Sequence, residues 1–211
     1  MVTSIQEYAE QRGITYLFHF TRSENLGSII QRGLVTRDVL IQEGNISACN
    51  DVYRIDGTNA VCLSIAFPNY KMFWSLRERA KDQVIDWVVL AIRPAVLWEL
   101  PSVFCRENAA AASVTAIPVG RRKLLGAFKS MYDDFDEKKR AQLPIMDDYP
   151  TNPQAEVLML DGVPRSYILG AYVLNNQAQN RLAALHSGLE FRVNASYFRY
   201  RADYEQWRKI S

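Results

Sequence analysis

Residues 16–21 read Tyr-Leu-Phe-His-Phe-Thr, and residues 22–34 read Arg-Ser-Glu-Asn-Leu-Gly-Ser-Ile-Ile-Gln-Arg-Gly-Leu. The first six residues are typical of a short strand, because aromatic residues favour the extended backbone. Side chains alternate along a strand, so His19 and Thr21 would share one face while Phe18 and Phe20 share the other. This strand would therefore carry two hydrogen-bonding side chains on one face and an apolar surface on the other.

The residues after this strand predict a short helix. Thr21 and Glu24 have the spacing of a capping box, an apolar stripe at helical spacing follows in residues 26–30, and Gly33 can end the helix. A strand that delivers His19 and Thr21 to the start of a helix is a plausible cradle for a polar, anionic ligand. The alternative is a core strand whose histidine is satisfied by a backbone carbonyl.

The composition is that of an ordinary globular protein. The chain has 211 residues, of which 48% are hydrophobic and 23% charged, and its net charge is +2. Its three cysteines form no CxxC pair, and its amino end shows neither a basic start nor an apolar run. Charged residues and proline interrupt the most apolar region, residues 84–100, so it cannot supply the ~20 apolar residues of a membrane span. These features predict a cytoplasmic protein without a membrane segment.

The rest of the chain predicts an α+β fold with a mostly antiparallel sheet and flanking helices. Helices are expected at residues 4–13, 70–79, 121–131 and 176–186, and further strands at residues 61–65, 87–92, 154–160, 170–174, 190–193 and 197–200. Long irregular segments are expected at residues 36–60 and 109–150, and such segments are often functional. No repeat or linker stands out, so we expect a single domain over residues 1–211.

Glu156 is the first candidate for chemistry. It begins an otherwise apolar strand, where a carboxylate is partly desolvated, and Gln154 would project to the same face. The carboxylate and the amide together could hold a substrate hydroxyl and orient an attacking group. The alternative is an edge-strand carboxylate that faces water.

Two other segments suit a nucleic acid. Arg54 lies in the first irregular segment, where a guanidinium can clamp a phosphate; a salt bridge to Asp51 or Asp56 is the alternative. Residues 69–74 combine aromatic side chains with Lys71 at a helix start, which suits stacking on exposed bases, although the same aromatics can pack in a core. The sequence shows neither a dinucleotide-binding glycine motif nor a metal-ligand pattern, so no catalytic metal is expected.

In their order along the chain, these elements resemble the DarT family of DNA ADP-ribosyltransferase toxins, and more broadly the ADP-ribosyltransferase fold. The resemblance is strongest at residues 14–35, 50–75 and 152–164. It implies that NAD is the co-substrate and that ADP-ribose is transferred to a base of single-stranded DNA, with release of nicotinamide. It also implies an antitoxin on a separate chain, either a macrodomain or a NADAR-type hydrolase.

The resemblance also implies roles for individual residues. Glu156 would take the place of the catalytic glutamate, and Arg54 would match the arginine between the cofactor and the target base. Residues 36–54 would close over NAD, and residues 110–153 would form the loop that recognises the substrate. The NAD-binding residues would be His19, Phe20, Thr21, Ser28 and Arg54, and the DNA-binding residues would be Tyr70, Lys71, Met72, Phe73 and Gln154.

Residues 67–73 depart from the pattern of the thymidine-modifying members. They look more like the other branch of the family, for which guanosine modification is expected, so both bases stay open. Two alternatives change the function further: an ADP-ribosyltransferase that acts on RNA or protein, and a nucleic-acid-binding module without catalysis. A small structural domain, in which His19 is simply satisfied, is the third.

Overall fold

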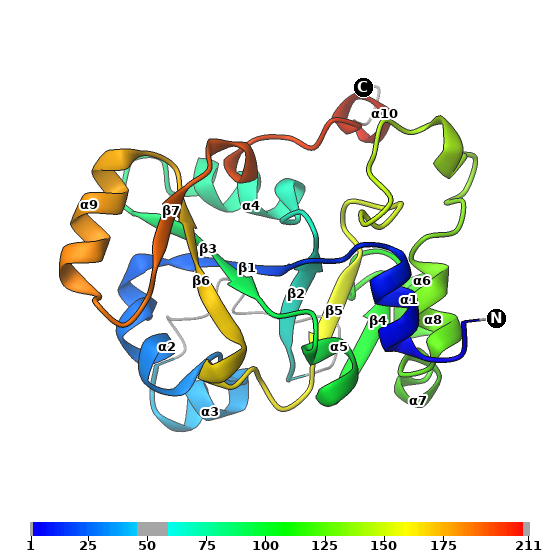
Figure 1. Cartoon of the computed structure of the whole chain (residues 1–211), viewed down its shortest axis with the longest axis horizontal. Helices are drawn as coiled ribbons and strands as arrows, with labels where there is room; N and C mark the ends of the chain where they lie inside the picture. Colours follow the sequence, from blue (N-terminus) through cyan, green and yellow to red (C-terminus); the bar gives the residue numbers. More distant parts are fainter. Residues whose placement is uncertain (1, 46–58, 209–211) are drawn as a thin grey trace.

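The computed structural model describes residues 2–45 and 59–208. Its centre is a seven-stranded sheet with the order β4-β5-β2-β1-β3-β6-β7 (Figure 1). The strands are β1 (Leu17–Arg22), β2 (Val61–Ile65), β3 (Trp87–Ile92), β4 (Ser102–Cys105), β5 (Glu156–Met159), β6 (Ile168–Val173) and β7 (Phe191–Val193). All neighbouring strands pair antiparallel except β6 and β7, which are parallel. The predicted α+β fold with a mostly antiparallel sheet is confirmed.

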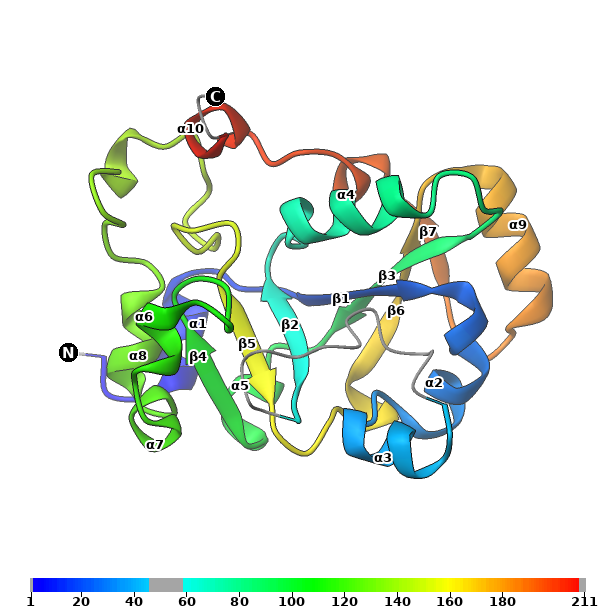
Figure 2. The ribbon, with the colours of Figure 1, turned by 180° about the vertical axis from the view of Figure 1, so that it is seen from behind.

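Short helices surround the sheet. They are α1 (Ile5–Gln11), α2 (Leu26–Arg32), α3 (Arg37–Gln42), α4 (Tyr70–Arg79), α5 (Val96–Glu99), α6 (Ala112–Thr115), α7 (Val119–Arg122), α8 (Leu125–Ser130), α9 (Asn176–Leu185) and α10 (Tyr204–Trp207). Figures 1 and 2 show α4 and the carboxyl end on one side of the sheet, α3 on the opposite side, and α1 with α8 beside β4. In the described part of the chain, no helix combines the length and the hydropathy needed to cross a bilayer.

The alternation of side chains along β1 divides the core. Leu17 packs into the large apolar cluster, whereas Phe18 and Phe20 pack into a second cluster that contains Phe73 and Phe198. Phe20 and Phe73 stack with ring centroids 4.6 Å apart. The predicted division of this strand into two faces is therefore confirmed for its apolar side chains.

β1 separates from β2 partway along its length. β1 pairs with β3 at all six of its residues, but in the described structure it is in register with β2 only at Leu17 and Phe18. Beyond that point β2 continues its ladder with β5. The His19 ring crosses the opening, and its Nδ1 lies 2.9 Å from the Cys62 carbonyl oxygen. The sheet thus consists of two half-sheets, β4-β5-β2 and β1-β3-β6-β7, which diverge on one side of Phe18.

The corner after β1 differs from the predicted capping box. Thr21 still belongs to β1, residues 23–25 form a 3-10 turn, and Asn25 is the residue that precedes α2. The Thr21 hydroxyl accepts a hydrogen bond from Asn25 Nδ2 at 2.8 Å. The prediction of a Thr21–Glu24 box is wrong because Arg22 is the residue that precedes the turn, and Thr21 pairs with Val88 inside β1.

Gly33 ends α2, as the sequence predicts. Its φ is +86°, and a Cβ atom built at this position would lie 2.1 Å from the Val163 carbonyl oxygen. The next residue, Leu34, exchanges two backbone hydrogen bonds of 2.8 Å with Val163. Only glycine combines this backbone conformation with so close an approach of a second chain segment.

Other boundaries test the sequence-based expectations further. The helix at 70–79 and the strands at 61–65 and 87–92 are confirmed, and the strand expected at 154–160 begins at Glu156. The structure departs from expectation in four places. Residues 37–42, expected to be irregular, form α3, and β4 is a strand that was not predicted. The single helix expected at residues 121–131 is divided into α7 and α8, and residues 195–198 form a 3-10 turn where a strand was expected at residues 197–200.

Candidate active site

A cavity of about 380 Å³ lies where β1 and β2 separate. Its walls come from β1, the first half of β2, α2 and the residues after it, the start of α4, residues 108–110 and Glu156. Its volume is within the range of roughly 300–1,000 Å³ typical of small-molecule sites. The opening in the sheet therefore forms a ligand-sized site between segments that are distant in the sequence.

Part of the predicted site lines this cavity. The predicted residues among its lining are His19, Phe20, Thr21, Ser28, Met72 and Glu156. Because a carbonyl oxygen only accepts, the contact with Cys62 requires the proton of His19 on Nδ1. A backbone carbonyl thus satisfies His19, as the alternative interpretation of this strand expected. His19 nevertheless lines the cavity.

Glu156 is buried at the first position of β5. Its side chain is 5% exposed, and its Oε2 accepts a hydrogen bond from the Ala109 amide at 2.8 Å. β5 lies between β4 and β2, so this is not an edge strand. The alternative of a carboxylate facing water is wrong. A buried carboxyl group held by a backbone amide instead presents its oxygen atoms to the cavity in a fixed orientation.

Two residues of the cavity wall have buried polar atoms without a hydrogen-bond partner. In the described structure four side-chain atoms are in this state: Arg37 Nε, Asn69 Nδ2, Tyr70 Oη and Arg106 Nε. Arg37 and Asn69 both line the cavity. The Asn69 side chain is oriented by its other end, because Oδ1 accepts from the Met72 amide at 3.2 Å at the start of α4. An unsatisfied buried donor costs about 1–3 kcal/mol, and a polar ligand in the cavity would remove this cost for Arg37 and Asn69.

Sequence reasoning assigned neither these two residues nor Ala109 to the site. Asn69 carried a visible signal, since an asparagine before an apolar helix is typical of an N-cap. Arg37 lay in a segment expected to be irregular, and the contact of Ala109 with Glu156 depends on the unpredicted pairing of β4 with β5. Among the described residues, no three His, Cys, Asp or Glu side chains are arranged to hold a metal ion.

Several predicted DNA-binding residues lie outside the cavity. Tyr70 is 2% exposed and Phe73 1% exposed, so neither offers a ring face to a base, and the alternative of core packing holds for both. Burial, with the Asp203 carboxylate nearby, raises the pKa of Tyr70. Lys71 donates from Nζ to the Trp207 carbonyl oxygen at 2.8 Å. Gln154 is half-buried in the turn before β5 and does not line the cavity.

Arg54 lies outside the described residues, as do residues 46–54 of the segment expected to close over NAD. The described part of that segment, residues 36–45, is α3 with its flanking residues. Of these, Arg37, Leu40 and Asn45 line the cavity. This segment therefore forms a wall of the site before the described chain breaks off at residue 45.

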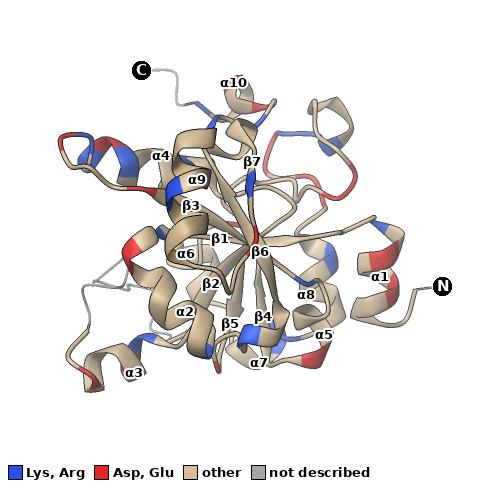
Figure 3. Ribbon diagram, turned by 60° about the vertical axis from the view of Figure 1, so that its left-hand side comes forward, with Lys and Arg blue, Asp and Glu red and all other residues tan. Residues whose placement is uncertain are grey.

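Two aromatic side chains are exposed in the described part of the chain. Trp74 on α4 is 48% exposed, and Tyr200 is 43% exposed. Their ring centroids lie 6.4 Å apart, and Tyr200 stacks on Tyr204 at 4.1 Å. Arginine and lysine alternate with acidic residues over the ribbon, including the end of α4 (Figure 3). Trp74, rather than Tyr70 or Phe73, is therefore the α4 ring available for stacking.

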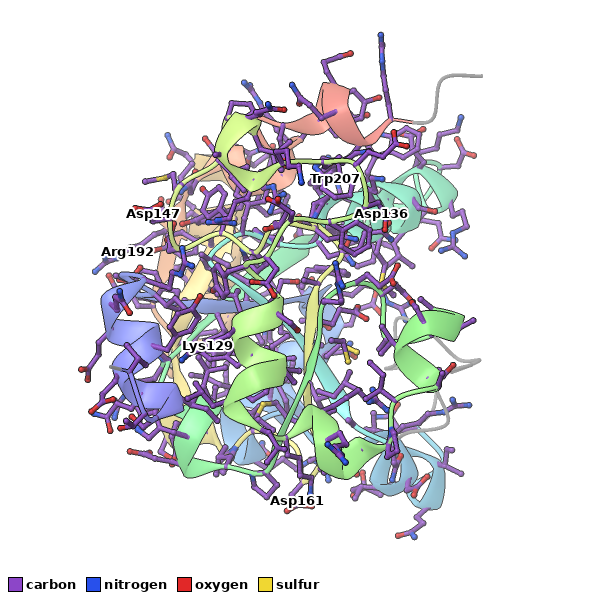
Figure 4. The ribbon with its side chains drawn as sticks, turned by 90° about the vertical axis from the view of Figure 1, so that its right-hand side faces the viewer. Lys129, Asp136, Asp147, Asp161, Arg192 and Trp207 are labelled. Carbon is purple, nitrogen blue, oxygen red and sulfur yellow. The ribbon has the colours of Figure 1, made fainter. Side chains whose placement is uncertain are left out.

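An arginine from the carboxyl end holds the loop before Glu156. Arg201 donates to the carbonyl oxygens of Pro150 at 2.9 Å and Thr151 at 2.8 Å, and it pairs with Asp203 at 2.5 Å. The Asp203 carboxylate also accepts from Trp207 Nε1 at 2.7 Å. Both charged side chains are buried, at 3% and 0% exposure. Trp207 lies at the same end of the molecule as Asp136 in Figure 4, far from Asp161.

Comparison with known protein families gives a match over most of this chain. A family model described as ssDNA thymidine ADP-ribosyltransferase, DarT, matches residues 18–199. Among curated proteins the comparison found no significant match.

Three solved structures are similar in fold. Thermosipho africanus DarTG in complex with ADP-ribose is 15% identical with a TM-score of 0.56, and the match covers 87% of this chain and 51% of that chain. Thermus sp. 2.9 DarT in complex with ADP-ribosylated ssDNA is 13% identical with a TM-score of 0.58, over 89% of this chain and 97% of that chain. The same protein in complex with NAD+ is 12% identical with a TM-score of 0.52, over 88% and 98%. The chain therefore spans about half the length of DarTG and nearly the whole of Thermus DarT.

Proposed function

This chain belongs to the DarT family, and from that premise we propose that it transfers ADP-ribose from NAD to a base of single-stranded DNA. The observation that carries the proposal is the buried carboxylate of Glu156 at a ligand-sized cavity between the two half-sheets. The solved DarT structures with NAD+ and with ADP-ribosylated ssDNA support both substrates. The unsatisfied donors of Arg37 and Asn69 fit a ligand rich in acceptors, as a dinucleotide is.

In the proposed reaction, the bond between the nicotinamide nitrogen and C1′ of its ribose breaks, and nicotinamide leaves with the bonding electrons as a neutral molecule. A nitrogen of the base forms a new bond to C1′ and releases its proton. Positive charge develops on the ribose in between. Glu156 stabilises that charge from a site where little water screens it, and the Ala109 amide keeps the carboxylate oriented.

The target base is proposed to reach the cavity from a single strand. A base within a duplex would first have to be unstacked, at a cost of roughly a few kcal/mol. Thymidine, named in the family description, is the first base to test, and guanosine is its competitor because of residues 67–73. Met72 lines the cavity from α4 and is therefore the α4 side chain we assign to the reacting base.

We further propose that the protein acts as a toxin in the cytoplasm and that a separate antitoxin removes the modification. The family match and the similarity to DarTG support an antitoxin partner. A macrodomain or a NADAR-type hydrolase would have to cleave the new bond between C1′ and the base. Adding either purified hydrolase to modified DNA, and following the return of the unmodified mass, distinguishes the two classes.

A transfer assay tests the proposed function. The full chain is incubated with NAD and single-stranded oligonucleotides that each contain one kind of reactive base, and the masses of the products are measured by mass spectrometry. We expect one added ADP-ribose on DNA and an equal amount of released nicotinamide. Transfer to RNA or protein but not to DNA would support the alternative target of the same fold. Folded protein that consumes no NAD with any acceptor would contradict the proposed activity.

Replacing Trp74 by alanine is expected to weaken the interaction with DNA. Stacking on an aromatic side chain contributes about 1–3 kcal/mol per base, so the KM for a long oligonucleotide should rise at least about fivefold. The KM for NAD should not change, since Trp74 does not line the cavity. Leu124→Ala removes another exposed apolar side chain, 56% exposed on the α7–α8 turn, and should change neither constant. An unchanged KM for DNA in Trp74→Ala would contradict this role.

A further inference from the structure

Arg37 occupies a position that its structural surroundings do not explain. It is the first residue of α3, and its side chain is half-buried and lines the cavity. Its Nε is buried without a hydrogen-bond partner. The backbone amide of Arg37 donates to the Asn59 carbonyl oxygen at 3.4 Å, so its main chain is anchored, whereas its guanidinium has no hydrogen bond to any of the described residues.

The described surroundings also give Arg37 no counter-ion. Glu24 and Glu156 are the carboxylates in the cavity lining, and neither forms a salt bridge with Arg37 in the described structure. Arg32, the last residue of α2, is by contrast held by Glu43 through two hydrogen bonds of 2.5 and 2.6 Å. A half-buried guanidinium without carboxylate or carbonyl partners is suited to an anion that arrives with a ligand.

We propose that Arg37 binds the pyrophosphate of NAD and so positions the dinucleotide in the cavity. This inference rests on the proposed function, which supplies the dinucleotide. A guanidinium presents a rigid fork of donors that matches two phosphate oxygens, and Nε is one arm of that fork. With the pyrophosphate at Arg37 and the reacting ribose at Glu156, the two charged ends of the site would attract opposite parts of the same ligand.

The test measures binding without catalysis, in the full chain. ADP-ribose, which carries the pyrophosphate, is titrated by calorimetry, and adenosine, which carries none, is followed by ligand-observed NMR. We expect Arg37→Gln to weaken the affinity for ADP-ribose at least tenfold and to leave the affinity for adenosine within twofold of the wild type. Arg121→Gln removes the same charge from an exposed position on α7 and should leave both affinities unchanged. Affinity of the wild type for ADP-ribose should fall with salt, and that salt dependence should shrink in Arg37→Gln.

The remaining outcomes are equally decisive. Equal affinity of the wild type and Arg37→Gln for ADP-ribose would overturn the role of Arg37 and leave the proposed function intact. Loss of adenosine binding together with ADP-ribose binding would also overturn the role of Arg37, because the effect would not be specific to phosphate. Weakened binding of single-stranded DNA alone would assign Arg37 to a DNA phosphate instead. If Arg37→Gln does not fold, Arg37→Lys keeps the charge but loses the fork, and an unchanged ADP-ribose affinity in that variant would contradict the bidentate contact. Wild type that binds neither ADP-ribose nor NAD would overturn this proposal and the proposed function together.

Discussion

Replacing Glu156 by glutamine should reduce ADP-ribose transfer to DNA at least about a hundredfold, as the loss of a preorganised electrostatic stabiliser does in other enzymes. The amide has almost the same shape, and its oxygen can still accept from the Ala109 amide, so the fold should be kept. What is lost is the negative charge that opposes the positive charge on the ribose. The rate at saturating NAD and DNA measures the effect.

Binding separates this catalytic role from a structural one. The variant should still bind ADP-ribose, measured by calorimetry, with an affinity within a fewfold of the wild type. Glu10→Gln makes the same change of charge on the exposed face of α1 and should transfer ADP-ribose at the normal rate. A Glu156→Gln variant with full activity would exclude the carboxylate from the reaction, and the non-catalytic binding module would become the better hypothesis.

Replacing Arg201 by methionine should lower the free energy of unfolding by about 3–5 kcal/mol, because it leaves the Asp203 carboxylate buried without its partner. It also removes the donors to the carbonyl oxygens of Pro150 and Thr151. Thermal unfolding followed by circular dichroism should show a fall in Tm of roughly 10 °C for a chain of this length.

Two controls isolate the buried pair. Arg192→Met breaks a pair with Glu190 that is 64% and 62% exposed, and such a surface pair contributes at most about 1 kcal/mol. The double variant Arg201→Met, Asp203→Leu removes both charges and should be more stable than Arg201→Met alone. A double variant that is less stable than the single one would show that the charges themselves are not the source of the effect.

The elements that could be read from the sequence are those with strong local signals. β1 follows from its alternating side chains, and α4 from its apolar spacing and its capping residue, Asn69. Glu156 could be found for a similar reason, since a single carboxylate in an apolar strand is conspicuous. Each of these inferences needs only neighbouring residues.

Features that depend on distant segments could not be predicted in the same way. Lys71 contacts Trp207, which is 136 residues away, and the carboxyl-terminal segment covers the side of α4 that holds Tyr70. The local sequence shows that Tyr70 and Phe73 lie near the start of a helix, but it does not show that other segments of the chain bury them. Arg37 joins the site only because the sheet opens between β1 and β2, and no residue spacing reports that opening.

The opening between the half-sheets also suggests how the protein could be inhibited. His19 belongs to one half-sheet and Glu156 to the other, and the two halves share registered pairs at Leu17 and Phe18. In the described structure, two links therefore join the half-sheets: this short ladder, and the contact of His19 with the Cys62 carbonyl oxygen across the opening. A ligand that displaces the His19 ring from the Cys62 carbonyl oxygen would break the second link and widen the cavity, which would inhibit the protein without a contact to Glu156.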